Sequence, residues 1–552
     1  MDDSAPARPE TCAASGTPAD RTPADPETPA DRTPADRTPA HHETPAHNPE
    51  TPEVTTPLGT LRGVREDGLV RFRGVRFATA GRFEPPRPVT PWEGVRDALA
   101  EGAMCPQPPF TLALLALPKP IRPMDEDCFF LNITAPDAPS ETPRPVMVWI
   151  HGGSYVNGSG GGGIYDPARL VRDGDVIVVG INYRLGAFGF LALEGVAPGN
   201  LGIQDQLAAL EWVQHNIGSF GGDPQNVTLF GQSAGADAIA NLIAIPEADH
   251  LFARAILQSA PLGLHRNRDA VATQLGANFL AALSATVEGD APATTVEAGR
   301  RDRALTPDSH RTAHTPDPRT APVDQMLVAQ VAAMSPLAGD PFTAGMPYAP
   351  IADAWPVPPT NDVVARRTRR AGSLSVLVGY NRDDFSPFLE GAGVLRRARA
   401  SAVLRPLTEP LCALLTRRVF GAPALDLARQ LRNGGADVAT YRFDWRPKGT
   451  PWGACHCVEL PFFWGDEDFW RGSPMLAGVE WSDLEEFGRG LRRDWAAFAR
   501  GGAAALGWVA SPASPSSPAS PASPTPRAAP MSRTSRGSVD RRITFAPRYP
   551  TR

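Results

Sequence analysis

Short runs of apolar residues recur along the middle of the chain and predict strands that are buried on both faces of a sheet. Longer stretches compatible with amphipathic helices lie between and after them, such as Ile203–His215 and Trp481–Ala499. This alternation predicts an α/β fold with a mostly parallel central sheet, helices on both faces and large loop and helical insertions. The expected strands are Val146–Ile150, Val176–Tyr183, Val227–Phe230, Arg254–Gln258, Leu374–Gly379 and Thr440–Phe443.

One of these strands leads directly into a candidate nucleophile. Val227–Phe230 is followed by Gly231, Gln232, Ser233, Ala234 and Gly235, and then by a run that favours a helix. A Gly-x-Ser-x-Gly pattern between a strand and a helix is typical of a nucleophile elbow, a strained turn that exposes a serine hydroxyl. The pattern alone is common, but its position between these two elements favours a nucleophilic role for Ser233 over an ordinary glycine-rich turn.

A second glycine-rich turn offers the donors that such a nucleophile needs. Val146–Ile150 is followed by His151, Gly152, Gly153 and Ser154. Backbone N–H groups in a turn of this kind can stabilise an oxyanion, each contributing about 3–4 kcal/mol to the transition state. We therefore expect donors at Gly153, Ser154 and Ala234, with Gly152 shaping the turn.

The chain from about Val54 to Val509 resembles the type-B carboxylesterases of the α/β-hydrolase superfamily, the group that contains para-nitrobenzyl esterases and cholinesterases. The resemblance rests on several long blocks, and it implies an α/β-hydrolase fold and cofactor-free ester hydrolysis. The blocks are Phe72–Val75, Arg82–Pro86, Pro91–Gly94, Glu126–Asn132, Asn182–Leu191, Gly199–Gln206 and Asn216–Pro224.

The same resemblance implies the rest of a catalytic triad. The family's histidine segment corresponds to Gly453–Pro461, so His456 is the expected general base. The family's acidic residue corresponds to Asp384, although the family has Glu at this position and Gly where this chain has Phe385. A carboxylate of either kind can fix the tautomer of the histidine. Asp383 is the main alternative, and Glu390 is a more distant one.

Two of the six cysteines match a disulfide of secreted family members, namely Cys105 and Cys128. The bond is expected only in an oxidising compartment. Cys455 and Cys457 flank His456, but the sequence offers no further ligands nearby, so no metal site and no cofactor are expected. The span between Cys105 and Cys128 also lacks the Trp with which cholinesterases bind a quaternary ammonium group, which argues against a cholinesterase.

Composition adds limits on partners. The formal net charge of −6 gives no reason to expect nucleic acid as a partner, and no apolar stretch is long enough for a transmembrane helix. The start of the chain is acidic and polar, without the apolar region of a signal peptide, so a cytoplasmic location is expected, with secretion by another route left open. The sequence leaves the oligomeric state unknown.

The chain divides by composition. Residues 1–53 carry degenerate Thr/Pro/Ala/Asp repeats and are expected to be disordered, because they have too little apolar surface to drive folding. A catalytic domain is expected over residues 54–510, with a low-complexity insertion at about 284–322. A Ser/Pro-rich linker over 511–540 precedes a C-terminal segment, 541–552, that contains a possible last short strand.

Together these features predict a serine carboxylesterase that acts on small-molecule esters through an acyl-enzyme intermediate. The alternatives are a hydrolase for a specialised ester, lactone or carbamate, and a catalytically silent binding protein on the same fold. Silent members of the family characteristically lose the nucleophile or the histidine, whereas this chain keeps both.

Overall fold

The computed structural model describes residues 51–109, 122–264, 268–287, 316–337, 345–391, 393–401, 403–508 and 542–545. The described residues all belong to one compact unit. The predictions for residues 1–50 and for the linker over 511–540 therefore fall outside the described residues.

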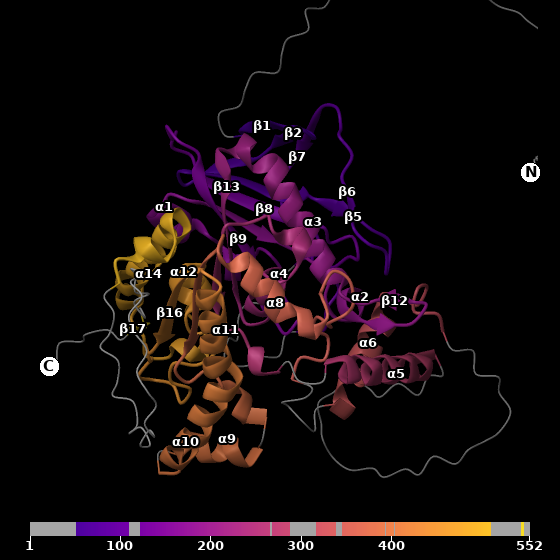
Figure 1. Cartoon of the computed structure of the whole chain (residues 1–552), viewed down its shortest axis with the longest axis vertical. Helices are drawn as coiled ribbons and strands as arrows, with labels where there is room; N and C mark the ends of the chain where they lie inside the picture. The colour runs from indigo at the N-terminus through magenta and orange to yellow at the C-terminus, as the bar shows by residue number, and fades with distance from the viewer. Residues whose placement is uncertain are drawn as a thin grey trace, which may run out of the picture. The chain divides into compact units, whose positions relative to one another are not determined.

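Ten of the described strands form one twisted sheet, shown in Figure 1. Seven neighbouring strands, in the spatial order β10-β9-β13-β14-β15-β16-β17, are all parallel to one another. β8, β4 and β3 continue the other edge in antiparallel fashion. In spatial order the strands are β17 (Arg542–Phe545), β16 (Asp437–Phe443), β15 (Ser375–Asn381), β14 (Arg254–Gln258), β13 (Gly222–Gln232), β9 (Arg144–Ile150), β10 (Ile177–Ile181), β8 (Phe130–Pro136), β4 (Leu69–Arg76) and β3 (Val64–Glu66).

Both faces of the sheet are buried, because side chains alternate between two apolar cores along each central strand. On β9, Val146, Val148 and Ile150 belong to one core, whereas Met147 and Trp149 belong to the other. β14 and β15 alternate in the same way. Continuous apolar runs are what this arrangement requires, which is why these strands could be predicted from the sequence.

Helices cover each face. The core that contains Val148 packs against α3 (Leu201–Asn216), α4 (Ala234–Leu242) and α11 (Ala422–Asn433), whereas the core that contains Trp149 packs against α12 (Leu460–Phe463) and α14 (Trp481–Gly501). The other helices are α1 (Ala168–Gly174), α2 (Gly186–Phe190), α5 (Arg268–Val287), α6 (Val323–Met334), α8 (Thr360–Ala371), α9 (Gly393–Ala400), α10 (Arg405–Thr416) and α13 (Glu467–Trp470). Within the described residues, no helix is long and apolar enough to cross a membrane.

Short strands outside the main sheet complete the unit. They are β1 (Glu53–Thr56), β2 (Gly59–Arg62), β5 (Ala78–Thr79), β6 (Arg87–Pro88), β7 (Val95–Asp97), β11 (Ala192–Leu193) and β12 (Ala197–Pro198).

The expected insertion at 284–322 is ordered at both ends. Its first residues, 284–287, form the last turn of α5, and the backbone carbonyls of Pro318 and Ala321 accept hydrogen bonds from Arg82. Residues 288–315, the middle of this segment, lie outside the description. The segment that resembles the family's last strand forms β17, which pairs in parallel with β16.

Candidate active site

Ser233 occupies a strained turn between β13 and α4. Its backbone has φ 56° and ψ −124°, a conformation that side-chain-bearing residues rarely adopt. A Cβ on Gly235 would lie 1.9 Å from the Ile150 carbonyl oxygen, and one on Gly231 would lie 2.7 Å from the Gly235 carbonyl carbon. Only glycine therefore fits at these two positions, and the close approach holds the elbow against the end of β9.

His456 and Asp384 come from the loops that follow β16 and β15. Nδ1 of His456 lies 2.8 Å from Oδ1 of Asp384, and both side chains are buried. The other carboxylate oxygen of Asp384 accepts a hydrogen bond of 2.8 Å from the Asn381 backbone N–H. This second bond fixes the direction of the carboxylate, so the turn brings the shorter Asp side chain within reach of the histidine.

Asp383 points elsewhere. Its Oδ2 accepts a hydrogen bond of 2.9 Å from the Ala454 backbone N–H and lies 3.2 Å from Nε of Arg446. These contacts tie the turn after β15 to the loop that carries His456. The side chain of Glu390, the third acid considered, lies outside the described residues.

Phe385, which stands where the family has Gly, packs its ring 5.5 Å from that of Phe388. Phe388 and Phe420 in turn lie with ring centroids 5.4 Å and 5.2 Å from the His456 ring. This aromatic wall could not be predicted from the sequence, because no pattern links residues so far apart in the chain. It gives the site an apolar side next to the histidine.

The sequence analysis also missed the role of Gln232. Its Nε2 lies 3.2 Å from Nε2 of His456, and its Oε1 lies 3.7 Å from the Cys457 sulfur. With Nδ1 of His456 donating to Asp384, Nε2 carries a lone pair and can accept from the amide. Across the described chain, no hydrogen bond joins Ser233 to His456, a contact that often forms only when substrate binds.

The loop after β9 lies directly against the nucleophile. A Cβ on Gly152 would lie 2.7 Å from the Gln232 carbonyl oxygen and 3.1 Å from Ser233 Cβ. Gly153 and Ser154 both have positive φ, 113° and 56°. Among the described residues, the backbone N–H groups of Gly153, Ser154 and Ala234 have no hydrogen-bond acceptor, so three donors remain available beside the serine.

His151 anchors this loop. Its ring stacks on that of Tyr183 with centroids 4.4 Å apart, and the Tyr183 hydroxyl donates to the His151 carbonyl oxygen at 2.8 Å. Burial lowers the pKa of His151 to about 4, so the ring is neutral near pH 7. This histidine supports the loop and does not present a charge to the site.

A second carboxyl group lies behind the histidine. Glu459 is buried and accepts a hydrogen bond from the Asn381 side-chain amide. Burial, and then the nearby charge of Asp384, raise the pKa of Glu459 to about 7. Glu459 therefore changes its protonation state close to neutral pH.

The five cysteines in the described part of the chain are free thiols. Cys105 and Cys128 are both buried and form no disulfide, and a hydrogen bond with the Cys105 side chain is the main cause that raises the pKa of Cys128. The disulfide implied by the resemblance remains a prediction for an oxidising compartment. Over the described residues, no cluster of His, Cys, Asp or Glu could hold a metal ion.

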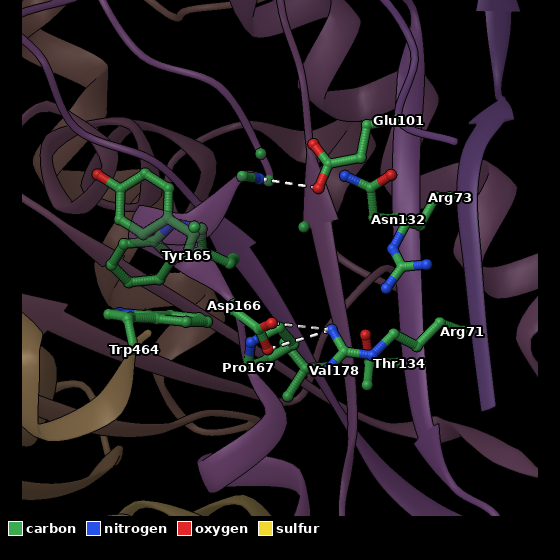
Figure 2. Close-up of a pocket in the computed structure, with 16 residues that line it drawn as sticks. Arg71, Arg73, Glu101, Asn132, Thr134, Tyr165, Asp166, Pro167, Val178 and Trp464 are labelled. Atoms are coloured by element: carbon green, nitrogen blue, oxygen red, sulfur yellow. Dashed lines mark hydrogen bonds and ion pairs between the residues drawn. The ribbon is translucent and has the colours of Figure 1, made fainter. Parts of the chain in front are cut away.

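A separate cavity of about 130 Å³ lies between β8, β10 and the loop 160–167 (Figure 2). Figure 2 shows Arg71 bonded to Asp166 on its wall. Glu101 accepts a hydrogen bond from the Gly162 backbone N–H. None of the expected catalytic residues lines this cavity, and we assign it no chemistry.

Known proteins resemble the chain over most of its length. The model of the carboxylesterase family matches residues 50–297. The chain is 34% identical to a probable N-octanoylanthranilate hydrolase of Rhodococcus erythropolis, over 81% of this chain and 93% of the relative. It is also 34% identical to the para-nitrobenzyl esterase of Bacillus subtilis, over 83% of this chain and 92% of the relative.

Solved structures give the same result. A PNB esterase structure superposes with a TM-score of 0.64 and 32% sequence identity, covering 81% of this chain and 90% of the other. The predicted α/β-hydrolase fold is therefore confirmed. The chain belongs to the carboxylesterase family of the α/β-hydrolase superfamily, and it is a serine hydrolase of carboxylic esters.

Proposed function

We propose that Ser233, His456 and Asp384 form the catalytic triad and that the enzyme prefers uncharged esters. The observation that carries the proposal is the buried contact of 2.8 Å between Asp384 and His456, beside a serine held in a strained turn. This contact joins the acid and the general base of a triad, and the turn that carries Ser233 supplies the nucleophile.

In the acylation step, the Ser233 hydroxyl attacks the ester carbonyl carbon while Nε2 of His456 takes its proton. For this to happen, Nε2 exchanges its hydrogen bond with Gln232 for one with Ser233. Asp384 keeps the Nδ1 proton in place and stabilises the imidazolium that forms. His456 then gives the proton to the departing alcohol, which leaves an acyl group on Ser233.

The negative charge on the carbonyl oxygen is held by the backbone N–H groups of Gly153, Ser154 and Ala234. These donors have no other acceptor among the described residues, so they need no reorganisation when the charge develops. In the second half of the reaction a water molecule, activated by His456, attacks the acyl group. The acid is released and Ser233 regains its proton.

The preference for uncharged esters rests on two observations. Phe388 and Phe420 form an apolar wall beside His456, and the two nearby aspartates already have partners. Asp384 is bonded to His456, and Asp383 is paired with Arg446, so neither offers a free negative charge to a cationic substrate. Residues 110–121, which belong to the span without Trp between Cys105 and Cys128, lie outside the described residues. Choline esters should accordingly be hydrolysed with lower kcat/KM than uncharged esters of the same size.

Relatives with specialised substrates suggest a panel for the assay. The match to a probable N-octanoylanthranilate hydrolase supports including N-octanoylanthranilate beside aryl and alkyl esters. Because this compound is an amide, a higher kcat/KM for it than for the simple esters would contradict the proposed preference for uncharged esters.

The test of the triad is a pair of serine variants. Ser233→Ala should lower kcat by several orders of magnitude with little change in Tm, because it removes only the nucleophile. Ser259→Ala is the matched control, since Ser259 also has a positive φ at the end of a strand but is fully enclosed. If Ser233→Ala keeps more than a few per cent of the activity while Ser259→Ala loses it, the proposed triad is wrong.

A further inference from the structure

The helix α10 is oriented with its apolar side outward. Leu404, Leu407, Leu411 and Leu414 are 45%, 76%, 37% and 61% exposed, and the preceding Val403 is 81% exposed. At about 100° per residue, the four leucines fall on one stripe of the helix. An exposed apolar stripe of this length is unusual on a soluble domain and marks a site of interaction.

The buried side of the same helix is polar. Thr408, Cys412 and Thr416 recur every fourth residue and are at most 6% exposed. The Thr416 hydroxyl accepts a hydrogen bond of 3.0 Å from the backbone N–H of Phe385, the residue after Asp384. This hydrogen bond holds the Thr416 side of the helix against the turn after β15, and the leucines on its other side face outward.

Charges near the stripe are mainly basic. Arg417 and Arg418 are exposed and follow Leu414 within one turn, and Arg397 is exposed on the neighbouring α9. The exposed acid of α10, Glu409, falls about half a turn away from the leucine stripe. A surface that presents negative charge above an apolar layer would complement this arrangement.

From the inverted amphipathic pattern and its basic border, we infer that α10 docks the enzyme on an anionic lipid surface. The leucines of the stripe enter the interface, while Arg397, Arg417 and Arg418 contact the lipid headgroups. A second copy of the chain is the less favourable occupant. A symmetric contact would bring the same arginines together, and five partly exposed side chains fall well short of the ~800 Å² per partner of a stable interface.

The position of α10 connects this surface to the reaction. The helix runs into the π-helical turn η7 (Arg417–Gly421), in which Phe420 packs against His456. In Figure 1, α9 and α10 lie together at the opposite end of the unit from β1 and β2. Apolar esters dissolved in the lipid surface would thus be close to His456. This consequence rests on the proposed triad, whereas the docking of α10 on lipid does not.

Vesicle flotation with the full chain tests the inference. The protein should float with vesicles of phosphatidylcholine and phosphatidylglycerol in equal parts, and much less with phosphatidylcholine alone. The double variant Leu407→Ser, Leu414→Ser should lower the partition coefficient by ~20-fold or more. The control variant Val331→Ser, Val364→Ser, with two exposed valines of α6 and α8, should float like the wild type.

Further variants separate the contributions. Arg397→Gln with Arg417→Gln should weaken binding to the anionic vesicles and leave the weak binding to phosphatidylcholine unchanged. Ser233→Ala should float normally, so a failure of docking is distinguished from a failure of the triad. Hydrolysis of a water-soluble ester without vesicles should be the same in the leucine double variant and in the wild type.

Two results would overturn the inference. One is a wild-type protein that does not float with anionic vesicles, or that floats equally well after the two leucine substitutions. The other is a wild-type dimer in light scattering that the leucine double variant converts to a monomer, which would assign α10 to contact between copies of the chain.

Discussion

At the scale of single residues, the two adjacent aspartates after β15 have different partners. Asp384 bonds to the ring of His456, whereas Asp383 bonds to the backbone of Ala454 and pairs with Arg446. The resemblance to the family favoured Asp384 in spite of its shorter side chain. The structure supplies the physical reason, because the bond from the Asn381 N–H directs the carboxylate toward the histidine.

Amide substitutions of the two aspartates should therefore have different effects. Asp384→Asn should lower kcat by about 10⁴ with a small change in Tm, since the tautomer of His456 is no longer fixed. Asp383→Asn should mainly lower Tm, because it weakens the link between two loops. Steady-state kinetics and thermal unfolding of both variants test this, and an inactive but well-folded Asp383→Asn beside an active Asp384→Asn would move the assignment by one residue.

Glu459 should give the stability of the enzyme a specific pH dependence. Its pKa is raised to about 7 by burial, so the folded state holds the proton more tightly than the unfolded state. The stabilisation from this group is fully present below the unfolded pKa of about 4.3 and is lost as pH rises through 7. The total change is on the order of 3 kcal/mol, at about 1.4 kcal/mol per pH unit.

The variant Glu459→Gln tests that contribution, because it removes the titrating carboxyl group and keeps a side chain of the same length. Its free energy of unfolding should rise relative to that of the wild type as pH increases from about 4 to 8. Denaturant unfolding across this range measures the difference. A difference that is independent of pH would show that Glu459 titrates normally in the folded protein.

At the scale of secondary-structure elements, a buried ion pair fixes α3 to the segment after β10. Arg184 contacts Asp205 through Nε and Nη2 at 2.8 Å and 2.7 Å, and both side chains are buried. Asp205→Asn should cost about 3–5 kcal/mol, because it leaves a buried guanidinium without its charge partner. Glu211→Gln, at an exposed position of the same helix, should change the free energy of unfolding by less than ~0.5 kcal/mol. Equal losses in the two variants would contradict this account.

Most central strands could be predicted because burial on both faces leaves a continuous apolar run. The predicted Arg254–Gln258 coincides with β14, and the two helices named from the sequence, now α3 and α14, end within two residues of their predicted bounds. β13 begins earlier than predicted, at Gly222, because Gly222 pairs with Arg144 before a shift in register. Such pairing depends on the neighbouring strand and leaves no apolar pattern.

Two features of the site could not be predicted. The contact of Gln232 with His456 and the wall of Phe388 and Phe420 join residues from separate elements, so no local spacing reports them. The outward direction of the leucines on α10 is a similar case. Periodicity identifies an apolar stripe, but an apolar stripe usually faces the core, and only the packed structure shows that here it does not.

At the scale of the whole molecule, both apolar cores and the proposed triad lie within the described part of residues 48–552. Deletion of residues 1–47 should leave both Tm and kcat/KM nearly unchanged, because the Thr/Pro/Ala/Asp repeats bury little apolar surface. Thermal unfolding and ester hydrolysis of the truncated protein check this. A decrease of several degrees in Tm would show that the repeats contribute to folding.

The central claim is that Ser233 is the nucleophile and that His456 and Asp384 activate it. The most direct measurement is covalent labelling with a fluorophosphonate, followed by mass-spectrometric mapping of the modified peptide. The account predicts a single label on Ser233, with labelling of the Asp384→Asn protein slower by orders of magnitude. A label on another residue, or labelling at the wild-type rate without the Asp384 carboxylate, would contradict it.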